Sequence, residues 1–212
     1  MHFHIITLFP ESFESYLKTS IIGRAIREKK IQVSLYNPRD FTADVWRRVD
    51  RRPYGGGPGM VLEAPSMLKA VEKAVKGRKG AKIIFFSPGG KQFDTAQAQK
   101  FAKNIQHLVL IAGHYEGVDA RVEKITKAER LSIGPYTLTG GELPALVVMD
   151  AVVRRLPGVL GNELSLEEER TASHEVYTRP ESLVYKKKTY RVPKVLFSGH
   201  HKNIEAWKKK KR

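Results

Sequence analysis

Apolar residues in the first 160 positions form short runs that alternate with stretches of helical spacing. The runs predict strands at His4–Phe9, Ile31–Tyr36, Lys82–Phe86 and Leu108–Ala112. The helical spacing predicts helices at Phe13–Lys29, Pro65–Val75, Thr95–Lys103 and Leu143–Leu156. Strands and helices that alternate in this way are typical of an α/β fold with a largely parallel sheet.

The pattern changes after Gly161. Residues 163–170 are acidic and then polar, which indicates a linker or a short exposed helix. The following part is small and carries two basic runs, Lys186–Arg191 and Lys208–Arg212. We therefore expect one domain over residues 1–160, a linker or lid over 161–178, and a short basic segment over 179–212. Basic runs are usually solvated surface, but an RNA-facing role is the alternative.

The charge of the chain is unusual. Its 38 Lys and Arg residues against 22 Asp and Glu give a formal net charge of +16. A field of this sign attracts polyanions, so nucleic acid is the leading partner, although a basic and merely soluble protein would show the same excess. The absence of cysteine excludes disulfides, thiolate catalysis, zinc ribbons and iron–sulfur clusters. The sequence contains neither a signal peptide nor a membrane-spanning run, so we expect a cytoplasmic protein.

Common catalytic motifs are missing. The chain has no dinucleotide-binding glycine fingerprint, P-loop, zinc-protease helix or serine nucleophile elbow. His200 and His201 are adjacent but have no spaced partners, so we interpret them as surface or structural residues.

Glycine is instead concentrated where apolar strands end. Such turns allow backbone amides to approach a ligand, and strand ends are where open α/β proteins bind ligands. Four segments share this feature: Arg52–Met60, Ser87–Gly90, Gly113–Gly117 and Ser132–Pro144. Together they predict a pocket lined by backbone for a small planar molecule.

These segments resemble the bacterial tRNA (guanine-N1)-methyltransferases of the TrmD type, which belong to the knotted SPOUT superfamily. Further matching segments occur in the family's order along nearly the whole chain: Ile6–Pro10, Asn37–Phe41, Pro157–Gly161, Tyr177–Glu181 and Ser198–His200. The resemblance implies an α/β SPOUT fold, a largely parallel sheet with a deep C-terminal trefoil knot, and a small reduced helical C-terminal segment.

By resemblance, the knot loops would bind S-adenosylmethionine in a bent shape. The family's cofactor-binding positions match these residues: Phe86, Ser87, Pro88, Gly113, Tyr115, Glu116, Gly117, Ser132, Ile133, Gly134, Tyr136, Leu138, Gly140, Gly141 and Pro144. For Ile133 and Leu138, ordinary core packing is the alternative interpretation.

The resemblance also implies the catalytic groups. Arg154 matches the family's cationic residue, although an ion pair with Asp150 would equally suit its spacing. The family's catalytic aspartate falls at Glu169, with Glu168 as the alternative, and solvated linker acids remain the competing interpretation. A carboxylate would accept the proton of guanine N1, and a cation would stabilise the negative charge that develops at O6.

The implied substrate is the tRNA anticodon stem-loop, methylated at the guanosine 3′ of the anticodon. Another RNA, such as ribosomal RNA, and a catalytically inactive RNA-binding homologue are the alternatives. The expected substrate-binding residues are Asp50, Gly57, Gly59, Arg154, Lys186, Lys187 and Lys188. The family implies a homodimer with the helix Leu143–Leu156 at the interface and the active site across it. It also implies Mg²⁺, for which the sequence offers no dedicated oxygen cage.

Overall fold

The computed structural model describes residues 1–161 and 175–210. The chain consists of two compact units, Met1–Leu160 and Gly161–Arg212.

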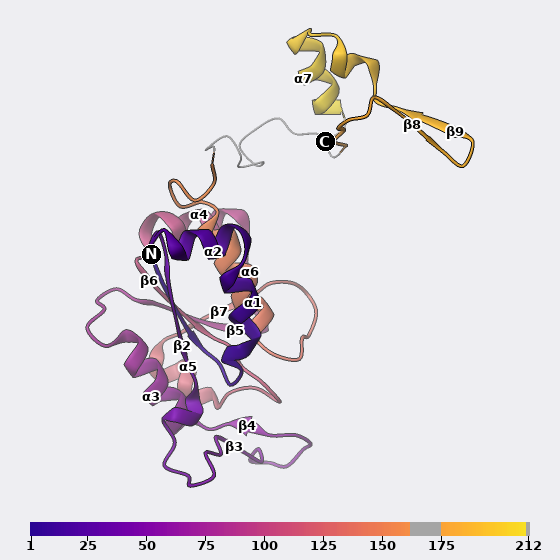
Figure 1. The fold of residues 1–212 in the computed structure, drawn as a ribbon. Coiled ribbons are helices and arrows are strands. Elements are labelled where there is room, and N and C mark those ends of the chain that lie inside the picture. The colour runs from indigo at the N-terminus through magenta and orange to yellow at the C-terminus, as the bar shows by residue number, and fades with distance from the viewer. Residues whose placement is uncertain (162–174, 211–212) are drawn as a thin grey trace. The chain divides into compact units, whose positions relative to one another are not determined.

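The first unit is built on a five-stranded sheet in the order β2-β1-β6-β5-β7 (Figure 1). The strands of this sheet are β1 (His2–Ile6), β2 (Gln32–Tyr36), β5 (Lys82–Gln92), β6 (His107–Ile111) and β7 (Glu129–Ser132). Every neighbouring pair is parallel, which confirms the predicted α/β fold with a parallel sheet. A separate antiparallel pair joins β3 (Asp50–Arg51) to β4 (Val61–Leu62).

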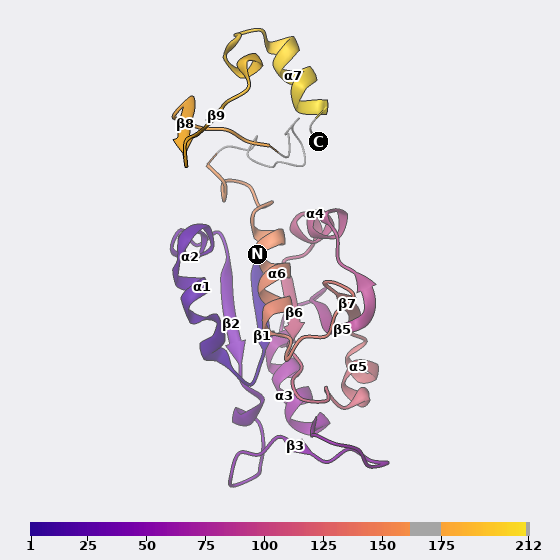
Figure 2. The same cartoon turned by 90° about the vertical axis from the view of Figure 1, so that its right-hand side faces the viewer.

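Helices cover both faces of the sheet (Figure 2). They are α1 (Glu14–Lys18), α2 (Ser20–Arg27), α3 (Ala64–Val75), α4 (Thr95–Asn104), α5 (Ala120–Thr126) and α6 (Glu142–Val153), with 3-10 turns at Pro10–Phe13 and Pro38–Asp40. Alternate strand residues divide the core. Phe3 and Ile5 pack with α2, α4 and α6, whereas Ile6 and Val109 pack with α3 and α5. The sheet is therefore buried on both faces.

The helix expected over 13–29 is broken. Thr19 is extended at φ −114° and ψ 162°, and Ser20 has φ +50°, so α1 and α2 are separate. The strand expected to end at Phe86 is longer than predicted. A register shift between Phe86 and Lys91 lets β5 resume its pairing with β7. Both differences arise where local backbone geometry, rather than apolar spacing, sets the boundary.

Several short elements were not predicted, among them α5 and β7. Helix α5 buries only Val122, so its sequence shows little apolar periodicity. Strand β7 is four residues long and begins with two charged residues, Glu129 and Arg130. Elements this short carry a weak sequence signal, and contacts with the sheet supply most of their stabilisation.

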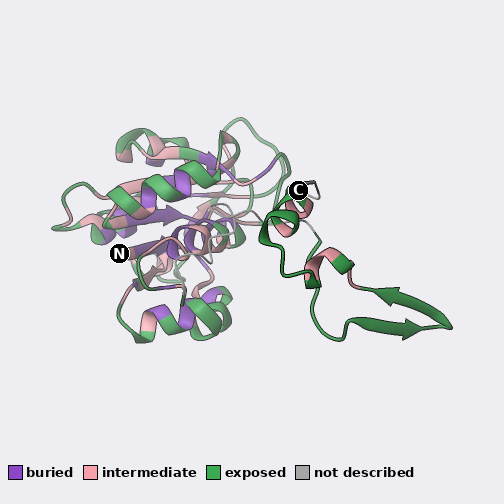
Figure 3. Ribbon diagram, turned by 90° about the horizontal axis from the view of Figure 1, so that it is seen from above, coloured by how far each residue is buried: buried purple, intermediate pink, exposed green. Residues whose placement is uncertain are grey.

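The second unit is not only helical. It contains an antiparallel hairpin of β8 (Ser182–Tyr185) and β9 (Lys188–Arg191), a 3-10 turn at Lys194–Phe197, and helix α7 (His201–Lys210). The hairpin is exposed throughout (Figure 3). Its turn residues, Lys186 and Lys187, both have positive φ. Among the described residues, no helix has the length and apolar character needed to cross a bilayer.

Candidate active site

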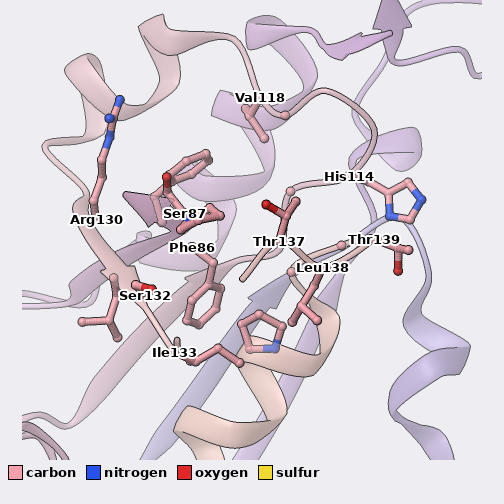
Figure 4. Close-up of a pocket in the computed structure, with 18 of the residues that line it drawn as sticks. Phe86, Ser87, His114, Val118, Arg130, Ser132, Ile133, Thr137, Leu138 and Thr139 are labelled. Atoms are coloured by element: carbon pink, nitrogen blue, oxygen red, sulfur yellow. The ribbon is translucent and has the colours of Figure 1, made fainter. Parts of the chain in front are cut away.

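A cavity of about 330 Å³ lies at the carboxyl ends of β5, β6 and β7. Three segments line it: the end of the regular part of β5, the loop after β6, and the loop between β7 and α6. Phe86, Ile133 and Leu138 gather on one side, and His114 lies at another (Figure 4). Parallel strands direct their carboxyl ends to one edge, so three segments distant in sequence meet there.

Glycine is required where these segments cross. The amide of Gly141 donates a hydrogen bond to the carbonyl of Gly113 at 2.8 Å. A Cβ atom on Gly141 would lie 2.5 Å from the Cα of Ala112, and one on Gly90 would lie 2.6 Å from the backbone nitrogen of Leu131. Backbone cannot move aside as a flexible side chain can. Any larger residue at Gly141 would separate the two loops that form the cavity.

The loop between β7 and α6 is held by a few local hydrogen bonds. Ser132 Oγ donates to the carbonyl of Gly134 at 2.9 Å, and Tyr136 Oη donates to the carbonyl of Ile133 at 3.2 Å. Within the described part of the chain, the backbone amides of Thr137, Leu138 and Thr139 have no hydrogen-bond acceptor. These amides are therefore available to a ligand in the cavity.

One corner of the cavity is polar and was not predicted. His114 Nδ1 is buried without a hydrogen-bond partner among the described residues, 3.8 Å from Glu142 Oε2. Glu142 Oε1 accepts a 2.8 Å hydrogen bond from Thr7, which is fully buried. Further lining residues that the sequence did not single out are Phe85, Val118, Arg130, Leu131, Thr137 and Thr139. His114 stands inside the predicted Gly113–Gly117 turn, which was its only sequence signal.

The residues expected to bind the cofactor all line this cavity. They are Phe86, Ser87, Pro88, Gly113, Tyr115, Glu116, Gly117, Ser132, Ile133, Gly134, Tyr136, Leu138, Gly140, Gly141 and Pro144. Ile133 is partly buried against the main core, so it contributes to both the core and the cavity.

The loop after β3 contacts Glu116, a cavity-lining residue in the loop after β6. The amide of Glu116 donates to the carbonyl of Met60 at 3.0 Å, and a Cβ on Gly59 would lie 2.5 Å from Glu116 Oε1. Asp50 lies on β3, paired with Leu62 of β4. Gly57 is exposed, and a Cβ atom on it would meet nothing within 4 Å, so it belongs to the open part of this loop.

The other expected residues do not line the cavity. Arg154 is the C-terminal cap of α6, ten residues after Pro144, which lines the cavity, so about 15 Å of helix separates Arg154 from it. Lys186 and Lys187 form the hairpin turn of the second unit, and Lys188 is the first residue of β9. Glu168 and Glu169 lie outside the described residues.

Comparison with known proteins identifies the family of this chain. A family model described as tRNA (Guanine-1)-methyltransferase TrmD matches residues 1–212. The chain belongs to this family. A tRNA (guanine-N(1)-)-methyltransferase of Photobacterium profundum is 46% identical over 97% of this chain and 83% of the relative. The Methylococcus capsulatus protein of the same name is 46% identical over 99% of this chain and 84% of the relative.

A third organism gives the same result. The protein of that name from Moorella thermoacetica is 43% identical over 99% of this chain and 84% of the relative. The predicted family is confirmed, and membership makes the chain a tRNA (guanine-N1)-methyltransferase. The glycine turns that border the cavity are the segments on which the sequence resemblance was based.

Proposed function

We propose that this enzyme transfers the methyl group of S-adenosylmethionine to N1 of the guanosine immediately 3′ of the anticodon in tRNA. The observation that carries this proposal is the glycine-lined cavity at the carboxyl ends of β5, β6 and β7 in a chain of the TrmD family.

The cavity suits a compact adenosine-containing ligand. Its volume, about 330 Å³, lies at the small end of the range for ligand sites, which favours a bent ligand. Phe86, Ile133 and Leu138 offer apolar contacts to a purine ring, and the amides of Leu138 and Thr139 offer donors to its ring nitrogens. When bound, S-adenosylmethionine supplies an electrophilic methyl group on a sulfonium.

The proposal includes a trefoil knot in the first unit. From β7 at the edge of the sheet, the chain must cross the end of β5 to reach the end of β6. There Gly140 forms an antiparallel bridge with His114, and Gly141 contacts Ala112 and Gly113 before α6 begins. This return past two earlier loops supports a threaded crossing, a rare exception to the usual un-knotted connection.

A homodimer accounts for two properties of α6. The helix is apolar on nearly all sides, yet Leu143 is 61% exposed and Val147 is 46% exposed, one turn apart. An apolar stripe of this kind is expected to pack against a second copy. A second copy would also explain why Arg154 is distant from the cavity of its own chain: the arginine would serve the site of the partner.

In this scheme the protein supplies a base and a cation. A carboxylate, Glu169 or Glu168, accepts the proton of guanine N1, and both residues lie outside the described part of the chain. The guanidinium of Arg154 stabilises the negative charge that develops at O6 as the proton leaves. Direct displacement then forms the bond between N1 and the methyl carbon, and the bond between that carbon and sulfur breaks.

Phosphate contacts would come from basic residues outside the cavity. Lys186, Lys187 and Lys188 are exposed at the hairpin turn, where they can approach an RNA backbone. Asp50 lies on β3, and Gly57 lies on the loop that follows it. Mg²⁺ would be held by water, the RNA and one or two carboxylates, because no cluster of three acids occurs among the described residues.

The deciding experiment incubates purified protein and labelled S-adenosylmethionine with a tRNA transcript, followed by mapping of the labelled nucleotide. We expect label at N1 of the guanosine 3′ of the anticodon, and none in a transcript with adenosine at that position. Label found only in ribosomal RNA would show that the substrate is ribosomal RNA and not tRNA. A protein that binds tRNA but transfers no label would be an inactive homologue.

A further inference from the structure

Three histidines meet at the opposite end of the sheet from the cavity. His2 and His107 are register partners on β1 and β6, and His4 follows two residues later on the same face. Their ring centroids lie 3.9 to 5.8 Å apart. One nitrogen from each ring can be chosen so that all three lie within 4.8 Å of one another. The methyl-transfer scheme uses none of these residues.

The tautomer of His4 is set by its surroundings. His4 is fully buried, and its Nδ1 lies 3.1 Å from Tyr36 Oη. If Nδ1 carries the proton and donates it to the tyrosine oxygen, Nε2 presents a lone pair. That Nε2 lies 3.2 Å from His107 Nδ1. A hydrogen bond from the ring nitrogen that faces away from the metal is how metal-binding histidines are usually oriented.

The spacing fits one metal ion. Two nitrogens bound to tetrahedral zinc at about 2.0–2.1 Å are separated by about 3.3 Å, close to the observed 3.2 Å. His2 is only partly buried, which leaves its ring room to turn and shorten the third distance once the 2.9 Å contact from its Nε2 to Ser34 Oγ is exchanged for the metal.

We propose that His2, His4 and His107 form a binding site for one borderline divalent transition-metal ion, with Zn²⁺ as the natural occupant class and water as the fourth ligand. Imidazole prefers such ions to Mg²⁺, which requires oxygen ligands. The site joins β1 to β6 and does not depend on the methyl-transfer chemistry.

The positive charges near the site lower its affinity for a metal ion. Arg78 and the N-terminal amine are the charged groups whose fields reach the rings, and they oppose a dication. Arg78 is held by carbonyls at the end of α3, including a 3.0 Å bond to Ala74. Burial, together with the charges of His2, Arg78 and His107, lowers the pKa of His4 to about 3.

The test titrates ZnCl₂ into the full chain after metal removal with EDTA, by calorimetry and by thermal unfolding. We expect one Zn²⁺ per chain and a rise in Tm of roughly 5–10 °C at a hundredfold excess of free Zn²⁺ over its Kd. The ring ¹H–¹⁵N signals of three histidines should shift together. MgCl₂ should produce neither effect.

Two variants locate the ion. His107→Gln should abolish binding, whereas the control His200→Gln with His201→Gln, which alters the exposed histidine pair, should retain it. His2→Gln repeats the test if His107→Gln unfolds, and circular dichroism checks the fold of each variant. The proposal is overturned if the wild-type chain binds no Zn²⁺, or if binding survives both His107→Gln and His2→Gln.

Discussion

The two ends of the parallel sheet differ in the groups that they present. The carboxyl end is shaped by backbone, because Gly90 and Gly141 let neighbouring segments come into close backbone contact beside the cavity. The amino end presents side chains, with three imidazoles on adjacent strands. Backbone amides suit a ligand read by shape and hydrogen bonds, whereas convergent imidazoles suit a metal ion.

The difference also predicts how each end responds to mutation. Changes at the carboxyl end should affect ligand binding and stability together, because the same backbone contacts create both. Changes at the amino end should affect stability or metal binding and leave methyl transfer intact.

Arg154→Ala has the largest expected effect and tests the catalytic role proposed for the residue that caps the C-terminus of α6. We expect kcat to fall about 10²–10³-fold while S-adenosylmethionine affinity is unchanged, because the lost cation acts on charge that develops only during proton removal. Single-turnover kinetics and calorimetry measure the two quantities. Arg155→Ala is the matched control, and an equal loss in both variants would contradict the role of Arg154.

Gly141→Ala tests the backbone contact at the carboxyl end. The added Cβ would lie 2.5 Å from Ala112 Cα, so we expect the free energy of unfolding to fall by about 2–3 kcal/mol and the methyl donor to bind weakly or not at all. Urea denaturation and calorimetry report the outcome. Gly89→Ala has open space around its Cβ and should leave both the free energy of unfolding and donor affinity unchanged. If Gly141→Ala also changed neither quantity, the contrast between the two ends of the sheet would be lost.

His4→Leu tests the side-chain end in the presence of EDTA. The substitution removes the contacts from His4 to Tyr36 and His107, and we expect a loss of about 1–2 kcal/mol in the free energy of unfolding. Donor affinity should be unchanged, in contrast to Gly141→Ala. His201→Leu, at an exposed position, is the control, and altered donor binding in His4→Leu would show that the two ends are coupled.

Tyr16→Phe tests the contact between α1 and the middle of α6. Tyr16 Oη donates a 2.5 Å hydrogen bond to Asp150 Oδ2, which together with burial raises the pKa of Tyr16 to about 12. Because the folded pKa exceeds the unfolded value of about 10, this contribution is complete below pH 10 and disappears as pH rises towards 12. Tyr16 is 39% exposed, so we expect only about 0.5 kcal/mol. Denaturation at pH 8 and pH 11 should show the variant's deficit shrinking at the higher pH.

Apolar runs predicted four of the five strands of the parallel sheet, whereas the individual cavity-lining residues came from the family resemblance and the glycine segments that carry it. Apolar runs mark buried strands, and glycine clusters such as Gly140–Gly141 mark their ends wherever the strands lie. The break at Thr19 and the extension of β5 beyond Phe86 had no such signal, since each depends on a few dihedral angles that the apolar pattern does not record.

The histidine cluster could not be predicted from spacing. His107 stands more than a hundred residues from His4, and they meet only because β6 pairs with β1 in a register that places His107 opposite His2. The sequence drew attention to His200 and His201 instead, because they are adjacent in the chain. Arg154 shows the converse limit, since the family resemblance proposes a catalytic role for a residue that lies far from the cavity.

The contact of Gly141 with Ala112 and Gly113 means that the cavity needs segments from two distant parts of the chain. A molecule whose loop between β7 and α6 has not docked lacks one wall of the cavity, however well its first strands are paired. Occupancy by a small ligand should therefore distinguish fully docked molecules from partly folded ones, and a ligand present during refolding should enrich the docked ones.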